Sequence, residues 1–223
     1  MSGKNNIGFL FDFDGVLADS HDLHWASWQL LQKEDPSFCM TQDQFFSGFG
    51  KRNELILKEL APVQSQAQHK KWAYRKEELF RQLAENQLGL LPGMAQFLTQ
   101  VMQAGIPHII ASSTPVANLE MFLQKTDVGL YFTDFVSAEQ VEHGKPAPDI
   151  FLAAAQKIEI PPKYCVVFED AQVGIEAGKA AGCFVVALAT TYPTDSLSGY
   201  DMIFPHPTAL DLDSILKKRA KML

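Results

Sequence analysis

The stretch from Ile7 to Ser20, IGFLFDFDGVLADS, is the starting point for interpreting the rest of the chain. An apolar run leads to two aspartates, Asp12 and Asp14, and then to a glycine. If the run continues as a strand, both carboxylates share one face, because side chains alternate along a strand. Two carboxylates at the end of a buried strand repel each other and are costly to desolvate. The stretch therefore predicts a buried strand that ends where a cation binds or a proton is shared.

The composition is that of a soluble globular protein with a sizeable core. The chain has 223 residues, of which 47% are hydrophobic, and this suits one domain with a large insertion or two small domains. Nineteen basic and 26 acidic residues give a net charge of -7, which argues against a nucleic-acid surface. We expect no membrane span and no signal peptide, because no apolar run reaches 18 residues and the start of the chain is polar. The three cysteines lack CxxC spacing, which indicates reduced thiols and a cytoplasmic protein.

The periodicity of the chain predicts a block of helices and then an alternation of strands and helices. Residues 20–88 carry several helical patterns, a capping box and no convincing strand; the helices are expected at 19–35, 52–60 and 67–88, and the box at 41–44. Further strands are expected at 107–111, 135–136, 165–168, 184–188 and 202–204, with a final helix from about residue 208. Alternating strands and helices indicate a doubly wound, parallel α/β sheet. We therefore expect a core of residues 1–19 and 90–223 with an all-helical cap of residues 20–89, joined through 17–21 and 88–92.

Three of the expected strands end in polar side chains, and one loop carries a lysine between prolines. The residues are Asp12 and Asp14, Ser112 and Ser113, Glu169 and Asp170, and Lys145. In an open α/β sheet, ligands bind outside the carboxyl ends of the strands. Gathered at one edge, these residues would supply oxygen ligands for Mg²⁺, a hydroxyl beside backbone N–H groups, and one ammonium.

The motifs, taken in this order, resemble the four motifs of the haloacid dehalogenase-like superfamily. They read Asp12-Phe-Asp14-Gly-Val, Ser112, Lys145-Pro-Ala-Pro-Asp149 and Glu169-Asp170. The resemblance covers essentially the whole chain, including a helical cap inserted after the first motif, and is greatest to the β-phosphoglucomutase and phosphoglycolate phosphatase-like branch. It implies a Rossmann-like catalytic core, Mg²⁺ as cofactor and a small phosphorylated metabolite as substrate.

The resemblance also implies roles for individual residues. Asp12 matches the nucleophile that forms an aspartyl-phosphate, and Asp14 matches the general acid and base. Lys145 and Ser112, with Ser113 as the alternative serine, match the residues that hold the phosphate. The metal ligands that it implies are Asp12, the carbonyl of Asp14, Glu169 and Asp170.

Charge counting predicts that the cap supplies further cations. Four carboxylates, one Mg²⁺ and one lysine leave no net positive charge, although a phosphoryl group in transfer needs it. Lys76 lies on the apolar stripe of its predicted helix, where a lysine is expensive unless it meets an anion. Lys51 and Arg52 follow the flexible loop at 48–50, and His24 lies just past the first junction. Mutase-type relatives place similar residues at matching positions, so these four are candidates for substrate recognition.

Four functions are compatible with parts of this pattern. A Mg²⁺-dependent phosphatase is favoured over a sugar phosphomutase, because Thr114, Pro115 and Val116 stand where the mutase type usually carries a lysine and an asparagine. A dehalogenase would need neither Mg²⁺ nor Asp14. A phospho-receiver signalling module would be far shorter and would lack the insertion. We expect a monomer that binds neither nucleic acid nor membrane, and the substrate is not readable from the sequence.

Overall fold

The computed structural model describes residues 7–85 and 87–222, and its centre is a parallel sheet. Six strands pair in the order β3-β2-β1-β4-β5-β6 within these residues. They are β1 (Gly8–Phe11), β2 (His108–Ser112), β3 (Phe135–Ser137), β4 (Cys165–Glu169), β5 (Phe184–Leu188) and β6 (Met202–Phe204). Because β1 lies between β2 and β4, the strand order reverses beside it. The carboxyl ends of β1 and β4 therefore border the crevice where a doubly wound sheet binds its ligand.

The strand residues alternate between two apolar layers. Phe11 and Phe168 face one layer, whereas Leu10 and Val167 face the other. The helices of the first layer are α5 (Met94–Gln103), α6 (Val116–Lys125) and α9 (Leu212–Ala220), and those of the second are α7 (Asp149–Lys157) and α8 (Gln172–Ala180). Because helices cover both faces, the strands are apolar along most of their length, as the sequence pattern predicted, and polar residues stand mainly at their ends. The predicted doubly wound α/β fold is confirmed.

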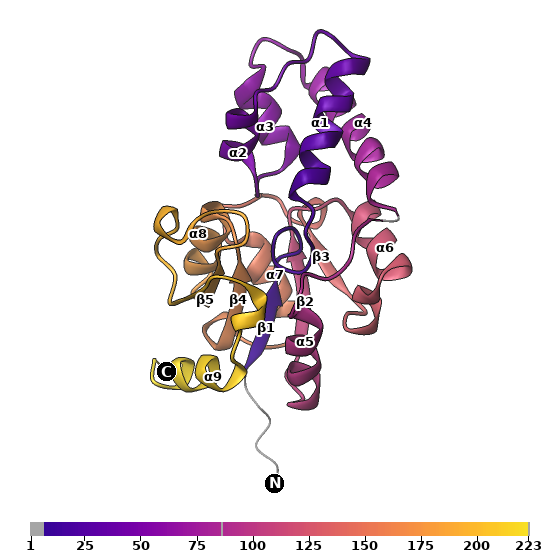
Figure 1. Cartoon of the computed structure of the whole chain (residues 1–223). Helices are drawn as coiled ribbons and strands as arrows, with labels where there is room; N and C mark the ends of the chain where they lie inside the picture. The colour runs from indigo at the N-terminus through magenta and orange to yellow at the C-terminus, as the bar shows by residue number, and fades with distance from the viewer. Residues whose placement is uncertain (1–6, 86, 223) are drawn as a thin grey trace.

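Four helices lie beyond the carboxyl end of the sheet and enclose an apolar cluster of their own (Figure 1). They are α1 (His21–Glu34), α2 (Gln42–Gly48), α3 (Asn53–Leu60) and α4 (Gln66–Ala84), and we call them the helical insertion. The two chain segments that join the insertion to the sheet pair with each other. Ala18 and Leu90 form an antiparallel bridge, and the N–H of Leu91 donates to the carbonyl of Leu17 at 2.7 Å. The insertion thus enters and leaves the core at one place.

The exact division at 19/20 and 89/90 remains our proposal for the domain boundaries. Small parts of the predicted core and cap lie outside the residues that the structure describes, namely residues 1–6, 86 and 223. No helix among the residues described is long and apolar enough to cross a membrane.

The ends of several elements differ from the prediction. Strand β1 ends at Phe11, so Asp12 and Asp14 lie in the turn that follows the strand and not on the strand itself. The predicted capping box is present, with Thr41 and Gln44 each accepting a backbone N–H from the other. Helix α4 ends at Ala84 instead of Leu88.

The final helix also begins later than predicted, at Leu212 and not near Thr208. Residues Pro207–Ala209 form a separate 3₁₀ turn. Asp211 then caps α9, because its side chain accepts the N–H of Asp213 at 3.1 Å. The prediction merged the turn and the helix because both are short and lie close together in the sequence.

The aromatic packing between β1 and β4 predicts a large loss of stability when it is removed. The rings of Phe11 and Phe168 stack at 4.4 Å, and both residues are fully buried. Phe168→Ala should lower the free energy of unfolding by about 3–5 kcal/mol, because it leaves a cavity under the site. Urea denaturation would measure this loss, with Leu152→Ala on the exposed side of α7 as the control. A loss below about 1 kcal/mol would contradict this account of the core.

Candidate active site

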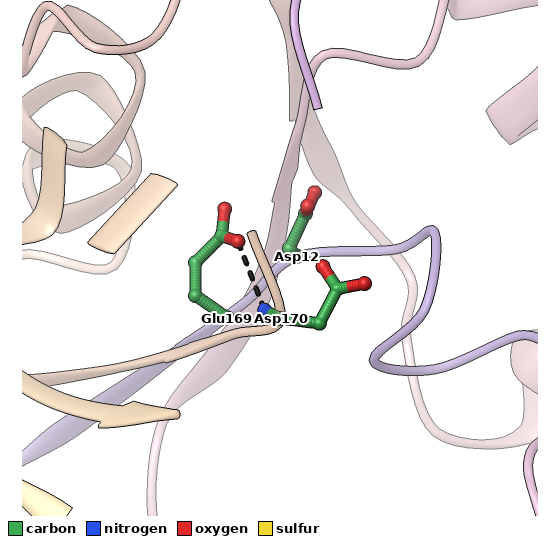
Figure 2. Close-up of side chains that lie close together, drawn as sticks. All are labelled: Asp12, Glu169 and Asp170. Atoms are coloured by element: carbon green, nitrogen blue, oxygen red, sulfur yellow. Dashed lines mark hydrogen bonds between the residues drawn. The ribbon is translucent and has the colours of Figure 1, made fainter. Parts of the chain in front are cut away.

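Three buried carboxylates meet at the carboxyl ends of β1 and β4 (Figure 2). Asp12 directly follows β1, Glu169 is the last residue of β4, and Asp170 follows it. One oxygen from each residue lies within 4.8 Å of an oxygen of each of the others. None of the three residues is more than 3% exposed. Such a cluster requires nearby positive charge, because buried like charges repel each other strongly.

Lys145 provides part of that charge. Its side chain is fully buried, and its Nζ lies 3.1 Å from Oδ2 of Asp12 and donates a hydrogen bond to Oε1 of Glu169. Burial alone would lower the pKa of Lys145, but the charges of Asp12 and Glu169 outweigh it and raise the pKa above its usual range. Oε2 of Glu169 accepts the backbone N–H groups of Asp170 at 3.0 Å and Ala171 at 3.2 Å, where α8 is about to begin. Glu169 is therefore held on both oxygens.

The other oxygens of the cluster lack a hydrogen-bond partner among the described residues. They are Oδ1 of Asp12 and both carboxylate oxygens of Asp170. Burial, followed by the charges of Glu169 and Asp12, raises the pKa of Asp170 well above its usual range. Unpartnered, buried carboxylate oxygens facing one another are the ligands that a hard divalent cation prefers. Asp12, Glu169 and Asp170 could hold such an ion.

Two glycines make room for the acidic cluster. Gly15 has φ of +74°, and a Cβ on it would lie 1.9 Å from Oδ2 of Asp170. A Cβ on Gly174, in the first turn of α8, would lie 1.9 Å from Oε1 of Glu169. Both glycines are needed because the carboxylates occupy the space that a side chain would take.

Asp14 lies apart from the acidic cluster and is bound by residues of the insertion and of the core. Its Oδ1 accepts hydrogen bonds from Ser20 at 2.5 Å and from Nε2 of His24 at 3.0 Å, and its Oδ2 accepts one from Thr114 at 2.5 Å. Burial alone would raise the pKa of Asp14, but His24 and the hydrogen bonds from these three residues hold it well below its usual range. Asp14 is therefore kept as a carboxylate in this conformation.

Lys76 determines which nitrogen of His24 carries the proton. Nζ of Lys76 lies 2.6 Å from Nδ1 of His24, and an ammonium can only donate a hydrogen bond. Nδ1 must therefore be the acceptor, so the proton is on Nε2, which donates to Asp14. His24 also stacks on the ring of Phe80 at 3.9 Å, which fixes the plane of the imidazole. The two cap candidates His24 and Lys76 thus belong to one chain of hydrogen bonds that ends on Asp14.

A cleft of about 740 Å³ lies between the insertion and the carboxyl end of the sheet. Its walls include predicted site residues from both parts of the chain: Asp12, Asp14, Ser112 and Ser113 from the core, and His24, Lys51, Arg52 and Lys76 from the insertion. Oγ of Ser112 lies 3.0 Å from Oγ1 of Thr114 and accepts the backbone N–H of Thr114 at 3.3 Å. The volume suits a ligand of metabolite size.

Ser113 differs from Ser112 in its contacts. Its hydroxyl donates to the carbonyl of Gly50 at 2.9 Å, and so connects the core to the loop between α2 and α3. The hydroxyl of Ser112 instead contacts that of Thr114, which in turn donates to Asp14. The two serines thus differ in their partners, and Ser112, which the sequence favours because it directly follows the apolar run, remains our proposal for the phosphate-binding serine.

Lys51 and Arg52 line the cleft, but both side chains have partners. Nζ of Lys51 pairs with Glu59 at 2.9 Å. The guanidinium of Arg52 donates to the carbonyls of Val141 at 2.9 Å and Glu142 at 3.2 Å. Their positions agree with contact to a substrate, whereas their positive groups are occupied in this conformation.

Three residues of the cleft region were not singled out from the sequence. Glu77 contacts Lys76, Asn118 of α6 donates to Glu77 at 2.6 Å, and Arg81 donates to the side-chain amide oxygen of Asn118 at 2.8 Å. For Arg81 a signal existed, because it lies four residues after Glu77 and hence on the same face of α4. For Asn118 the sequence carries no such signal, because its contact with α4 depends on how the insertion packs on the core.

Comparisons with known proteins agree with this geometry. Residues 8–182 match the family model of the haloacid dehalogenase-like hydrolases. The chain is 34% identical to hexitol phosphatase A of Escherichia coli (strain K12) over 202 residues, which are 88% of this chain and 89% of that protein. It is 28% identical to β-phosphoglucomutase of Bacillus subtilis (strain 168), covering 92% and 91%. The chloroplastic 5-amino-6-(5-phospho-D-ribitylamino)uracil phosphatase of Arabidopsis thaliana is 30% identical over 88% of this chain, and the chain spans about half of that relative, 53% of its length.

Among solved structures, a β-phosphoglucomutase from Clostridium difficile has a TM-score of 0.85 and 22% identity, over 96% of this chain and 97% of that one. This likeness supports the fold. The sheet, the insertion after β1 and the acidic cluster at the carboxyl ends of β1 and β4 define an α/β hydrolytic enzyme. The chain belongs to the haloacid dehalogenase-like hydrolases.

The contact between Glu77 and Lys76 predicts a pH-dependent contribution to stability. Burial alone would raise the pKa of Glu77, but the charge of Lys76 and the hydrogen bonds from Lys76 and Asn53 outweigh it, so the pKa in the folded protein is lower than in the unfolded chain. The stabilisation is therefore complete above the unfolded pKa, about 4.3, and is lost as pH falls through the folded value. Glu77→Gln should cost about 3 kcal/mol at pH 7, as for other broken buried ion pairs.

Urea unfolding at pH 7 and at about pH 3.5 would measure this difference, which should shrink at the lower pH. Glu78→Gln is the matched control, because Glu78 is the next residue on α4 and pairs with Arg75 near the surface. A difference between wild type and Glu77→Gln that stays constant with pH would contradict the ionised pair.

Proposed function

We propose that this enzyme is a Mg²⁺-dependent phosphatase that hydrolyses a small phosphorylated metabolite through an aspartyl-phosphate on Asp12. The observation that carries the proposal is the state of the Asp12 carboxylate. One oxygen is held by Lys145, the other has no hydrogen-bond partner among the described residues, and the residue lines the cleft. A carboxylate with one fixed and one unpartnered oxygen suits nucleophilic attack on phosphorus.

The acidic cluster fits the cation that this reaction needs. Asp12, Glu169 and Asp170 would hold Mg²⁺, together with the backbone carbonyl of Asp14. When bound, the ion neutralises negative charge on the phosphoryl oxygens during transfer. Lys145 and the hydroxyl of Ser112 would orient the same group from the core side.

Asp14 is suited to move protons on the substrate side of Asp12. Its carboxylate would accept a proton from water as water attacks the phosphoenzyme. In the first half of the reaction it must carry a proton for the leaving oxygen. A substrate that displaces one of the donors Ser20, His24 or Thr114 would raise the pKa of Asp14 toward that state.

The helical insertion would act as a cap that covers the cleft and excludes bulk water while the phosphoenzyme exists. Its side chains form one wall of the cleft, so they would select the group that carries the phosphate. Hexitol phosphatase A and the two other relatives described above are named for small phosphorylated compounds, which supports a substrate of that kind.

A sugar phosphomutase is the second candidate, favoured by the likeness to β-phosphoglucomutase and by the contact of His24 with Lys76. The residues after Ser113 weigh against it, because no lysine follows in the segment Thr114–Val116. Membership of a hydrolase family leaves the phospho-receiver module without support. A panel of sugar phosphates, tested with and without a bisphosphate primer, would separate hydrolysis from isomerisation.

The role of Asp12 predicts that its carboxylate is indispensable for turnover. Purified wild-type protein should release phosphate from p-nitrophenyl phosphate in the presence of Mg²⁺, and this release should stop when EDTA is added. Asp12→Asn should lower kcat about a thousandfold or more, as removal of a nucleophile does. Asp22→Asn, which alters a fully exposed carboxylate on α1, should have no effect. Turnover by Asp12→Asn at the wild-type rate would refute the proposed mechanism.

Because the carboxylate of Asp170 has no hydrogen-bond partner, we expect the stabilisation of the protein by Mg²⁺ to depend on this side chain. Asp170→Asn should leave the metal-free protein as stable as wild type or more so, because it removes repulsion within the buried cluster. Mg²⁺ should stabilise wild type by about 3 kcal/mol at 100 times its dissociation constant, and should stabilise Asp170→Asn much less. Thermal unfolding with Mg²⁺ and with EDTA would measure both effects. Equal stabilisation of the two proteins by Mg²⁺ would place the ion elsewhere.

A further inference from the structure

The cleft wall contains a buried carboxylate that the proposed reaction does not use, that of Glu77. The residue is 6% exposed and lines the cleft. Its Oε1 accepts hydrogen bonds from Lys76 at 2.7 Å and Asn53 at 2.6 Å, and its Oε2 accepts one from Asn118 at 2.6 Å. Three elements, α3, α4 and α6, thus hold this carboxylate in one position.

The side-chain amide of Asn118 has its orientation fixed by this network. Its oxygen accepts a hydrogen bond from Arg81, and its nitrogen donates to Glu77. The reverse orientation would set a donor against the guanidinium and an acceptor against the carboxylate. Asn118 is fully buried, so it cannot exchange these partners for water without moving.

Glu77 offsets the positive charge of Lys76 at the cleft wall. The two groups are in contact, and both are almost inaccessible to solvent, so screening by water is weak. Lys76 therefore attracts a substrate anion less than its position alone would suggest.

The rest of the cleft wall is also balanced in charge. Acidic and basic residues are equal in number among the described residues that line it: Asp12, Asp14, Glu54, Glu77 and Glu139 against Lys51, Arg52, Lys70, Lys76 and Arg81. A cleft that binds phosphate groups at both ends of a substrate needs an excess of positive charge. Here Lys145 and a bound cation would serve the reacting phosphate and offset Asp12, and the remaining five basic and four acidic residues leave an excess of one charge, less than a second phosphate dianion carries.

We propose that Glu77 is a specificity-determining residue that restricts the site to a single phosphate carried by a neutral, hydroxyl-bearing molecule. The inference rests on the proposed function. A second phosphate or a carboxylate near this wall would lose hydration and would meet only the Lys76–Glu77 pair, which has no net charge to attract it. A hydroxyl could donate to its Oε2, which accepts one hydrogen bond in the structure and can accept two. Glu77 would thus disfavour the bisphosphate on which a phosphomutase depends.

Three ligands that share one phosphate and differ at the other end test this inference. They are D-glucitol 6-phosphate, 6-phosphogluconate and D-glucitol 1,6-bisphosphate, which end in a hydroxyl, a carboxylate and a phosphate. Their binding would be measured by titration calorimetry with Mg²⁺ on Asp12→Asn protein, which prevents turnover. The hydroxyl-ended ligand should bind about tenfold more tightly than either of the others, because an anionic end would lose hydration at this wall without meeting net positive charge.

The double variant Asp12→Asn/Glu77→Gln should lose this preference, through tighter binding of the two anionic ends. Asp12→Asn/Glu77→Asp should keep it, because the charge is retained. Asp12→Asn/Glu78→Gln is the control, since it removes one negative charge from the same helix at its Arg75 contact near the surface.

The inference would be overturned if Glu77→Gln weakened the binding of all three ligands equally, as a purely structural role would. It would also be overturned if Asp12→Asn protein preferred the bisphosphate or the carboxylate, and this ranking decides the matter even if the Gln variant does not fold. Failure of the proposed function would be seen separately, as an absence of phosphate release by wild-type protein while the binding preference is intact.

Discussion

The contact of Lys145 with Asp12 and Glu169 allows acidic side chains to be buried at the carboxyl end of the sheet. Without an ammonium between them, two carboxylates so close together in the interior would take up protons or force the strands apart. The lysine reaches them from the loop before α7, and its own burial is tolerable only because both carboxylates are there. Loop, β1 and β4 are thereby bound to one another at the place where the strand order reverses. The sheet supplies the backbone positions, and this ion pair makes them compatible with acidic residues.

Asp12 and Asp14 are only two residues apart, but their carboxylates are surrounded by different charged and hydrogen-bonding groups. Asp12 belongs to a group of three carboxylates that shares the ammonium of Lys145, whereas Asp14 is surrounded by donors from Ser20, His24 and Thr114. Two donors come from the insertion side of the chain and one from the core, so Asp14 depends on contact between the two parts. Lys76 acts on Asp14 through the imidazole, because it decides which ring nitrogen holds the proton. In the proposed mechanism, the first group would hold a metal ion and the second would transfer a proton.

The core of the site could be predicted from sequence because it follows from local rules. Polar residues after apolar runs must meet at one edge of a parallel sheet, and so Asp12, Ser112 and Glu169 were found by position alone. Lys76 was found because a lysine on an apolar stripe needs an anion, although its carboxylate, Glu77, is its neighbour in sequence and was overlooked. Ser20 and Thr114, which bind Asp14, carry no such signal, because their contacts depend on the course of the loops that follow β1 and β2. The end of β1 was misjudged by a few residues, since Phe13 is as apolar as the strand residues before it.

The contacts between insertion and core differ from one side of the cleft to the other. Near the chain crossing, Phe80 of α4 packs on Phe122 of α6 in the apolar layer of the sheet. At the opposite rim the contacts include hydrogen bonds to backbone carbonyls, made by Arg52, Ser113 and Tyr192, and the ring of Tyr192 also packs on the apolar cluster of the insertion. Water can replace a hydrogen bond at a net cost of only about 1 kcal/mol, whereas separating aromatic rings exposes apolar surface. The interface is therefore weakest at the rim farthest from the aromatic contact. Thermal motion should open the cleft at that rim first, with the chain crossing as the hinge.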